Sequence, residues 1–364
     1  MKLIKSKVEL IKQEPGLEGL GKHIEKCGRV AYQSYDKITE NSYEAFVSMI
    51  KERNHGGVLE HGTVYLFINK IDYIASEGRD FDYKRYDSNP YSIVNIDSKG
   101  NYYITTNFRV LFENDWLNDL KYQVDTPTRY HEKRISIKFI CSIGIGREIL
   151  RHRVFSMIQE STRYCTYSND KFDNQLTFII PEWCKELPSG EYALLNSGKW
   201  IYTDIDSDRV DKFTFKDDEK INGFLHSLLA ADNAYRSLIS DGCIAQQARE
   251  VLPLATKTEI VMTGTVNDWK HFLSLRSPAY GAKGVHPDCA KLADNIYDIL
   301  ISEGYLFVLE DEYVCDDSRL EIIEAAKKDL LKSTNIEAAE DEMKVLSSTL
   351  FRCWQMGWLD KYKK

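Results

Sequence analysis

The stretch from Arg147 to Arg163 is the part of the chain best suited to chemistry, because it concentrates guanidinium groups around a histidine. Its cations are Arg147, Arg151, His152, Arg153 and Arg163. Each guanidinium can donate paired hydrogen bonds to a phosphate or another planar anion. If a helix ends near His152, Arg147 and Arg151 lie one turn apart on one face, where like charges repel. The spacing therefore predicts a site that holds an anion between them.

Other side chains in this stretch refine that prediction. Gln159 carries an amide that can read the edge of a base, and Ser161 and Thr162 add hydroxyl donors. Apolar and aromatic residues lie between them, namely Phe155, Met157, Ile158, Tyr164 and Tyr167. Such surroundings are partly desolvated, and a charge there needs a partner. The alternative is a solvated face on which the arginines pair with Glu148 and Glu160.

The spacing of these residues carries a resemblance to a known family. Arg151-His152-Arg153, seven residues and then Ser161, followed by Arg163-Tyr164, resembles the signature of the flavin-dependent thymidylate synthases, the ThyX family. Three further blocks agree in order with the family's His-x-x-x-x-Glu-His, Ala-Arg-x-x-Leu-Pro and His-Phe-Leu-x-Leu-Arg segments. They are 55–61, 248–254 and 271–276. The resemblance therefore runs from residue 55 to residue 276.

The resemblance implies an activity, cofactors and partners. Members of the family transfer a one-carbon unit from methylenetetrahydrofolate to C5 of dUMP, with a hydride from FAD and reduction of the flavin by NADPH. The chain is accordingly expected to be an FAD-dependent thymidylate synthase that uses dUMP and folate as small molecules. The resemblance also implies a homotetramer with active sites at subunit interfaces, and neither a nucleic acid nor a membrane as partner.

The resemblance further assigns site residues. The expected dUMP contacts are Glu148, Arg151, Gln159, Ser161, Thr162, Arg163, Arg249 and Arg276. The expected FAD contacts are His55, Gly57, Arg151, His152, Arg153, Gln159, Asn267 and His271. Arg276 is the expected catalytic residue, because a positive charge beside the uracil would stabilise negative charge that develops at N3 and O2. No metal is expected.

Five positions depart from the family's usual pattern. Gly57 stands where a Ser or Thr is common, and Glu148 stands where a Gln is expected to touch the nucleotide. Ile158-Gln159 replaces a common Asn-Glu pair, and Tyr280 lies about where a flavin-side His often occurs. These changes bear on the substrate and on individual contacts more than on the class of reaction.

Three other functions remain open at the level of sequence. The first keeps the site but hydroxymethylates, or modifies another pyrimidine nucleotide. The second is a metal-dependent hydrolase built on His55, Glu60 and His61, although these flank a loop instead of sharing a helix face. The third is a nucleotide-binding protein without catalysis. A cysteine nucleophile is disfavoured, because no cysteine falls inside the arginine cluster and the surroundings of Cys289 do not resemble the ordinary thymidylate synthases.

The composition is typical of a folded, soluble protein. It has 364 residues, 43% of them hydrophobic, which is enough to bury a large core. A net charge of -8 argues against a general nucleic-acid binder. Its 8 cysteines are scattered without a C-x-x-C pair, which disfavours a zinc knuckle or a redox dithiol. With no apolar run or export signal apparent, we expect a cytoplasmic protein.

The resemblance to the ThyX family implies an α+β fold with a central, mostly antiparallel sheet flanked by helices, and hydrophobic periodicity predicts the individual elements. Expected strands are 8–11, 63–68, 102–106, 135–141 and 177–181, with 261–265 as a strand or turn. Expected helices are 20–32, 43–50, 221–238, 243–251 and 290–300, and one after Ser142 that carries Arg147, Arg151 and His152 near its C-terminal end. We expect a catalytic domain at 1–310, with insertions at about 69–132 and 185–220, and a helical extension at 311–364.

Overall fold

The computed structural model describes residues 1–204, 207, 210–213 and 219–306. Met1–Ile299 form one compact unit, and Leu300–Lys364 form another. The expected helices of the tail beyond 311 lie outside the described residues. Within those residues the named strands form three sheets, and every pairing is antiparallel except that of β1 with β8. The expected α+β class is therefore confirmed.

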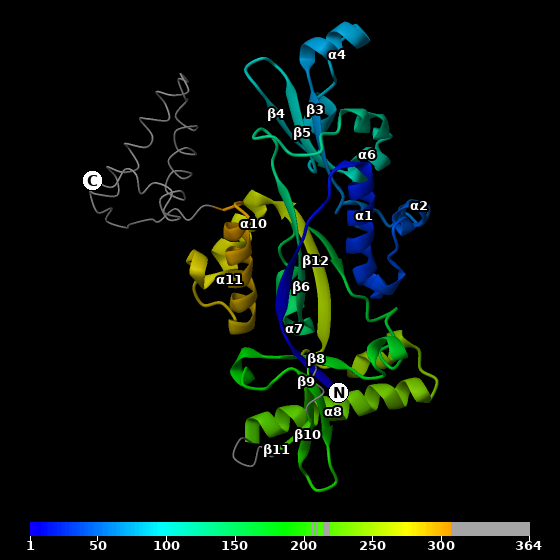
Figure 1. The fold of residues 1–364 in the computed structure, drawn as a ribbon, viewed down its shortest axis with the longest axis vertical. Coiled ribbons are helices and arrows are strands. Elements are labelled where there is room, and N and C mark those ends of the chain that lie inside the picture. Colours follow the sequence, from blue (N-terminus) through cyan, green and yellow to red (C-terminus); the bar gives the residue numbers. More distant parts are fainter. Residues whose placement is uncertain (205–206, 208–209, 214–218, 307–364) are drawn as a thin grey trace, which may run out of the picture. The chain divides into compact units, whose positions relative to one another are not determined.

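The central sheet has four antiparallel strands in the order β2-β6-β12-β7. They are β2 (Lys7–Ile11), β6 (Arg134–Ser142), β12 (Lys257–Thr265) and β7 (Ser156–Gln159). The two long strands, β6 and β12, run side by side (Figure 1) and pair along their whole length. β12 is buried at every position except its two ends, which explains why its sequence lacks the alternation of a half-exposed strand. The short segment expected as a strand or turn is thus a long strand.

A second sheet has the order β3-β5-β4. It consists of β3 (Thr63–Ile68), β5 (Tyr102–Asn107) and β4 (Ile93–Ile96). The stretch expected as an insertion, 69–132, supplies two of these strands, and the buried side chains of Tyr102 and Ile104 join Leu66 in one core. The same stretch forms α4 (Lys70–Glu77), α5 (Lys84–Asp87), α6 (Phe108–Glu113) and a 3₁₀ turn, Leu117–Tyr122. These residues therefore complete the sheet that β3 begins.

The core of this second sheet is covered by two helices near the N-terminus. They are α1 (Gly16–Gly28) and α2 (Ser42–Glu52), and a 3₁₀ turn at Arg29–Tyr32 follows α1. Their apolar faces carry Ile24 and Phe46 into the same core as Leu66. Both helices were expected, and the end of the first is a 3₁₀ turn instead of continued α-helix.

The third sheet has five strands in the order β11-β10-β9-β1-β8. They are β11 (Val210–Phe213), β10 (Trp200–Asp204), β9 (Gly190–Leu194), β1 (Lys2–Lys5) and β8 (Thr177–Ile180). The stretch expected as a second insertion, 185–220, supplies β9, β10 and β11. The long helix α8 (Glu219–Ser240) shares a core with this sheet, in which Leu225 and Tyr235 join Trp200.

The remaining helices are α3 (Gly56–Leu59), α7 (Ile143–Ile149), α9 (Ala245–Ala248), α10 (Val266–Arg276) and α11 (Pro287–Ser302). Of these, α3, α7 and α10 contact strands of the central sheet. Helix α10 starts at a capping box, in which Thr265 Oγ1 accepts from the Asp268 N–H (3.1 Å) and Asp268 accepts from Thr265. No helix in the described part of the chain is long and apolar enough to cross a membrane.

Two expectations about local structure are wrong. Helix α7 ends at Ile149, so Arg151 and His152 lie beyond it instead of on its last turn. The N–H groups of both residues donate to carbonyls three positions back, at Glu148 (3.3 Å) and Ile149 (3.1 Å), so the α-helical pattern is replaced by tighter turns. The expected loop at 55–61 contains the helical turn α3, closed by a bond from the Val58 N–H to the His55 carbonyl (3.0 Å).

Candidate active site

A cavity of about 340 Å³ opens where three segments of the chain meet. Its walls are Ile143, Arg147, Gln159, Glu160, Thr162, Arg249, Glu250, Leu252 and Leu254. Three of the residues expected to contact a nucleotide, Gln159, Thr162 and Arg249, thus come together from two blocks far apart in the sequence. The sequence could order these blocks, but only the fold brings them to one cavity.

The first wall is one face of α7. Ile143 and Arg147 are one helical turn apart and both line the cavity, whereas Ile145 and Ile149 are buried in the core. Gly146 lets the helix pack closely on β12, since a Cβ there would lie 3.1 Å from the Ile260 side chain. The helix therefore presents Arg147 from a fixed backbone.

The wall formed by 249–254 is tied to the start of α7. The Gly144 N–H donates to the Leu254 carbonyl (3.0 Å), and the Ile143 N–H donates to the Thr256 carbonyl (2.9 Å). Arg249 begins a 3₁₀ turn, Arg249–Val251, which directly follows α9. These bonds hold Arg249 and α7 as parts of one local structure.

The wall at 159–162 is anchored to β12 and to the turn that follows α1. Gln159 Nε2 donates to Thr258 Oγ1 (3.1 Å). The Glu160 N–H donates to the Glu259 carbonyl (2.8 Å), and the Ser161 N–H donates to the Ala31 carbonyl (3.0 Å). Successive residues are thus held by different parts of the fold, which limits the conformations that this wall can adopt.

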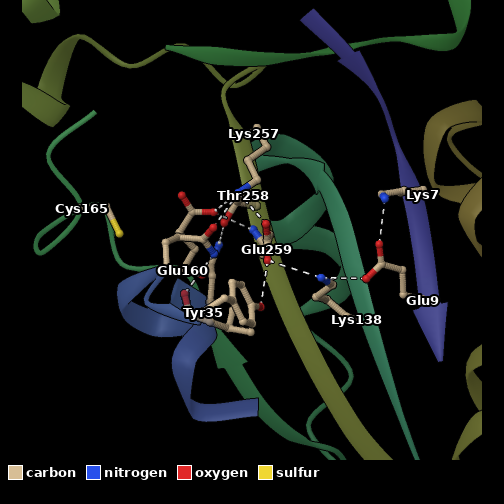
Figure 2. A network of polar contacts seen from close by, with 12 residues as sticks. Lys7, Glu9, Tyr35, Lys138, Glu160, Cys165, Lys257, Thr258 and Glu259 are labelled. Atoms are coloured by element: carbon tan, nitrogen blue, oxygen red, sulfur yellow. Dashed lines mark hydrogen bonds and ion pairs between the residues drawn. The ribbon is translucent and has the colours of Figure 1, made fainter. Parts of the chain in front are cut away.

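Glu160 lines the cavity, but its side chain is fully buried and points into a network of charges (Figure 2). Its carboxylate accepts from Lys257 Nζ (2.9 Å), from the Glu259 N–H (3.1 Å) and from the Tyr167 hydroxyl (3.0 Å). Burial raises the pKa of Glu160, and the charge of Lys257 opposes that rise. Burial lowers the pKa of Lys257, but the carboxylates of Glu160 and Glu259 outweigh it and raise the pKa overall.

The network continues across the central sheet. Glu259 accepts from the Tyr35 hydroxyl (3.1 Å) and pairs with Lys257 (2.7 Å) and more loosely with Lys138 (3.9 Å). Lys138 in turn pairs with Glu9 (2.7 Å), which also pairs with Lys7 (2.8 Å). We call this set the charge ladder; its members are Lys7, Glu9, Lys138, Glu160, Lys257 and Glu259. It spans β2, β6 and β12 (Figure 2) and ends at Glu160, which lines the cavity.

Arg276, the expected catalytic residue, lies in a separate cluster. Its Nη1 donates to Glu148 Oε2 (2.9 Å), its Nη2 to the Glu148 carbonyl (3.4 Å) and its Nε to His152 Nε2 (3.1 Å). His152 must be neutral to accept this bond. Burial, and then the charge of Arg276, lowers the pKa of His152 to about 4, which keeps the ring neutral near pH 7. The guanidinium is therefore held in place by two partners on the α7 side.

A cysteine lies near this cluster, although the positions of the cysteines along the chain did not predict it. Cys289 of α11 is close enough to Arg276 and Glu148 for their charges to act on its thiol. The residue is buried, and burial raises the pKa of Cys289 to about 11. The thiol is therefore protonated and poorly nucleophilic at neutral pH, so its proximity does not restore a cysteine mechanism.

The other expected nucleotide contacts lie outside the walls of the cavity. Ser161 follows the wall residue Glu160, and its Oγ accepts from the Arg163 N–H (3.3 Å). The Arg163 guanidinium lies over the ring of Tyr164, 5.6 Å from its centroid. Arg151 is exposed. Of the eight expected dUMP contacts, the cavity walls thus include Gln159, Thr162 and Arg249.

The residues expected to contact FAD are mostly at the surface. Exposed positions are His55, Gly57, Arg151, Arg153, Asn267 and His271. His152 is buried against Phe272, with ring centroids 4.8 Å apart, and Gln159 belongs to the cavity. A Cβ at Gly57 would meet no other atom within 4 Å, so this position opens onto free space.

The alternative metal site is not assembled. Glu60 pairs with Arg109 (2.5 Å), and His61 is buried with its Nδ1 at 2.8 Å from Thr263 Oγ1. His55 is exposed. Across the described residues there is no group of three His, Cys, Asp or Glu side chains placed to hold a metal ion. Nothing in these surroundings supports the hydrolase reading.

Comparison with known sequences identifies relatives of this chain. A viral relative, named a probable flavin-dependent thymidylate synthase of Paramecium bursaria Chlorella virus 1, is 26% identical over 163 residues, 45% of this chain and 65% of its own. A flavin-dependent thymidylate synthase of Corynebacterium efficiens is 32% identical over 138 residues, 37% of this chain and 47% of its own. The chain thus spans about half to two thirds of the length of these relatives.

Among solved structures, the chain is similar to a UMP/dUMP methylase, PolB, from Streptomyces cacaoi, with 18% identity, coverage of 83% of this chain and 93% of PolB, and a TM-score of 0.36. The sequence model of the family described as thymidylate synthase complementing protein matches residues 117–303, which is just over half of the 364 residues. The matched region contains the arginine cluster, all cavity walls and Arg276, and the chain therefore belongs to the family of the thymidylate synthase complementing proteins.

Proposed function

We propose that the protein is an FAD-dependent thymidylate synthase, which methylates dUMP to dTMP with methylenetetrahydrofolate as carbon donor and NADPH as reductant. The observation that carries this proposal is the meeting of Gln159, Thr162 and Arg249 at one cavity. The resemblance assigned all three to dUMP, although Arg249 belongs to a different block of sequence. The names of the viral and bacterial relatives support the same activity.

The described residues supply what binding of a pyrimidine nucleotide requires. Gln159 offers an amide for the base edge, and its position is fixed by the bond to Thr258. Thr162 offers a hydroxyl, and Arg249 offers a guanidinium for an anionic group. Ser161 and Arg163, next to this wall, are proposed to complete the site when the nucleotide binds.

Arg276 is proposed to act on the pyrimidine ring electrostatically. Its side chain is only 20% exposed, so its charge acts through a medium less polarisable than water. A fixed positive charge can stabilise negative charge that develops at N3 and O2 of the uracil. His152 orients the guanidinium without adding charge, and Glu148 orients it while offsetting part of its charge.

The residues assigned to FAD fit that cofactor in their chemistry. Arg151 and Arg153 are exposed, and the described residues offer neither guanidinium an ion pair, which suits the phosphates of a dinucleotide. His55, Asn267 and His271 add ring and amide groups, and the free space at Gly57 leaves room beside the backbone. When bound, the flavin supplies the hydride chemistry, and these residues bind and orient it.

We further propose a homotetramer with active sites at subunit interfaces, which would bring the exposed FAD residues of one subunit to the cavity of another. The proposed catalytic domain is 1–310, with insertions at about 69–132 and 185–220 and a helical extension at 311–364. Light scattering on the purified protein should give four times the mass of one chain. Full activity in a monomeric preparation would contradict this assembly.

The proposed activity can be tested with the purified full chain. It should take up FAD and show flavin absorbance, NADPH should bleach that absorbance faster when dUMP is present, and mass spectrometry should identify dTMP as product. The same assay with dCMP, and the product mass, separate methylation of dUMP from hydroxymethylation or action on another nucleotide. A protein that binds dUMP but cannot be loaded with FAD would be a nucleotide-binding protein instead.

A further inference from the structure

Arg134, the first residue of β6, is a cation to which the resemblance gives no role. Its Nη1 donates to the Glu60 carbonyl (3.1 Å) and to Thr63 Oγ1 (3.3 Å), and its Nη2 donates to Ser156 Oγ (3.1 Å). Its backbone pairs with Thr265, the last residue of β12. This one residue therefore contacts segments that lie far apart in the sequence.

The segments that meet at Arg134 are those to which the FAD contacts are assigned. Glu60 directly follows α3, and Thr265 is the N-cap of α10. Ser156 comes shortly after the Arg-His-Arg motif. The exposed FAD contacts on these three segments are His55, Gly57, Arg151, Arg153, Asn267 and His271. Arg134 thus reaches two of the segments through its guanidinium and the third through its backbone.

Two of these segments have few bonds of their own. Helix α3 is a single turn of 4 residues, and Arg151 lies in the turns beyond α7. So short a helical segment is marginal by itself and depends on its contacts with the rest of the fold. The bonds from Arg134 supply such a contact, since they join the end of α3 to the start of β7.

The charge of Arg134 is not neutralised by an acid. Among the residues that the structure describes, its guanidinium has only neutral acceptors, a carbonyl and two hydroxyls. The carboxylates whose charges act on it are engaged elsewhere, because Glu60 pairs with Arg109 and Asp268 accepts from Thr265. Burial lowers the pKa of Arg134, which shows that its surroundings are poor in water. A desolvated cation without a counter-ion favours an anion nearby, and FAD carries a pyrophosphate.

We propose that Arg134 is a positioning residue for FAD. Its guanidinium fixes the end of α3 against the segment that follows the Arg-His-Arg motif, so the contacts on both are in place before the cofactor binds. Binding groups that are held in place lower the entropic cost of association. This inference rests on the proposed function, because it assumes that the protein binds FAD. It adds a residue that acts through its neighbours and needs no contact with the flavin itself.

The test measures FAD binding by flavin fluorescence, in titrations of the flavin-free full chain, for the wild type, Arg134→Met and Arg134→Lys. Loss of a charged hydrogen-bond donor weakens an interaction by roughly 10- to 100-fold. We expect Arg134→Met to raise the FAD dissociation constant by that factor. Arg134→Lys should fall between, since an ammonium keeps the charge but lacks the paired donors that reach both segments. At saturating FAD, dTMP formation should return to the wild-type rate, so KM for FAD changes and kcat does not.

Arg85→Met is the matched control, because Arg85 is also a partly buried guanidinium, but its carboxylate partner, Asp119, lies outside these three segments. It should lower the free energy of unfolding in urea and leave the FAD dissociation constant unchanged. An equal rise in this constant for Arg85→Met would reduce the effect to general destabilisation and overturn the proposal.

An unchanged FAD dissociation constant in Arg134→Met would also overturn the positioning role while leaving the proposed function intact. If Arg134→Met does not fold, Arg134→Lys decides, and a wild-type dissociation constant in that variant has the same consequence. A wild-type chain that cannot be loaded with FAD would overturn the proposed function itself, so the two failures are distinguishable.

Discussion

Two neighbouring regions of this protein contain clusters of charged side chains. In one region the charges pair with each other, whereas in the other they pair loosely or not at all. In the charge ladder, each of the six members has a partner of opposite sign within 4 Å, and the chain runs from β2 across β6 and β12 to the cavity wall. At the cavity, Arg147 has no such partner among the described residues and Arg249 has a loose one. The charges of the first region are therefore paired among themselves, whereas those of the second remain available for a ligand.

The physical reason for the difference is burial at the end of the ladder next to the cavity. The side chains of Lys257 and Glu160 are 14% and 0% exposed, so an unpaired charge there would lose its hydration without compensation. Arg147 is exposed and keeps its hydration until an anion arrives. Glu160 belongs to both regions, because it lines the cavity while its carboxylate pairs with Lys257 in the ladder. The paired charges of the ladder thus hold the wall in place, and the arginines of the cavity remain available for a ligand.

The largest expected effect is on the closed region. Lys257→Met removes the cation that contacts both Glu160 and Glu259 and leaves two buried carboxylates without it. We expect the free energy of unfolding, measured in urea, to fall by about 3–5 kcal/mol. Lys22→Met is the matched control, because Lys22 also contacts two carboxylates but is solvated, and its loss should change stability little. Equal effects of the two substitutions would show that the ladder has no special structural role.

Arg276 has features of both regions. It is paired with Glu148, as the charges of the ladder are paired, but it is proposed to act on the substrate. Arg276→Ala should lower the rate of dTMP formation by roughly 10²- to 10³-fold, as expected for the loss of one electrostatic contact to the developing charge. The FAD content should stay the same. Lys270→Ala removes an exposed cation from the same helix and serves as control. An unchanged rate would remove Arg276 from the mechanism.

A third, smaller effect concerns buried polar groups that carry no charge. His23, Ser136, Thr263 and His61 form a hydrogen-bonded row beside the central sheet, with contacts of 2.9, 2.6 and 2.8 Å. Burial lowers the pKa of His23 to about 4 and that of His61 to about 3. Below the ordinary value of 6.5, the unfolded chain therefore binds protons that the folded chain does not.

Stability should consequently fall as the pH drops from 6.5 towards 4, by up to ~1.4 kcal/mol per pH unit for each histidine. Urea midpoints measured from about pH 7.5 to about pH 5.5 should stay flat above 6.5 and decline below it. His23→Gln should reduce the slope. A midpoint that does not change below pH 6.5 would mean that these rings take up protons in the folded protein.

The secondary structure could be predicted wherever apolar residues recur with the period of a strand or a helix. The alternation in 135–141 identified β6, and the apolar spacing in 221–238 identified α8. Prediction was weaker for β12, whose burial on both faces erases the alternation, and it failed at the end of α7, where local turns stop the helix before Arg151. Periodicity reports which residues share a face, so it misses a strand that is buried on both faces and does not show where local turns stop a helix.

The sequence by itself determined the family signature, because Arg151-His152-Arg153, Ser161 and Arg163 are recognised by type and spacing alone. It also indicated the α+β class and which arginines are candidates for binding an anion. Only the tertiary structure decided which of them face one cavity, because Arg147 and Arg249 are brought together by bonds between α7 and residues 254–256. It also decided that Arg276 is held by Glu148 and His152 and that Glu160 pairs with Lys257. Such pairings depend on distances across the fold, which spacing along the chain does not encode.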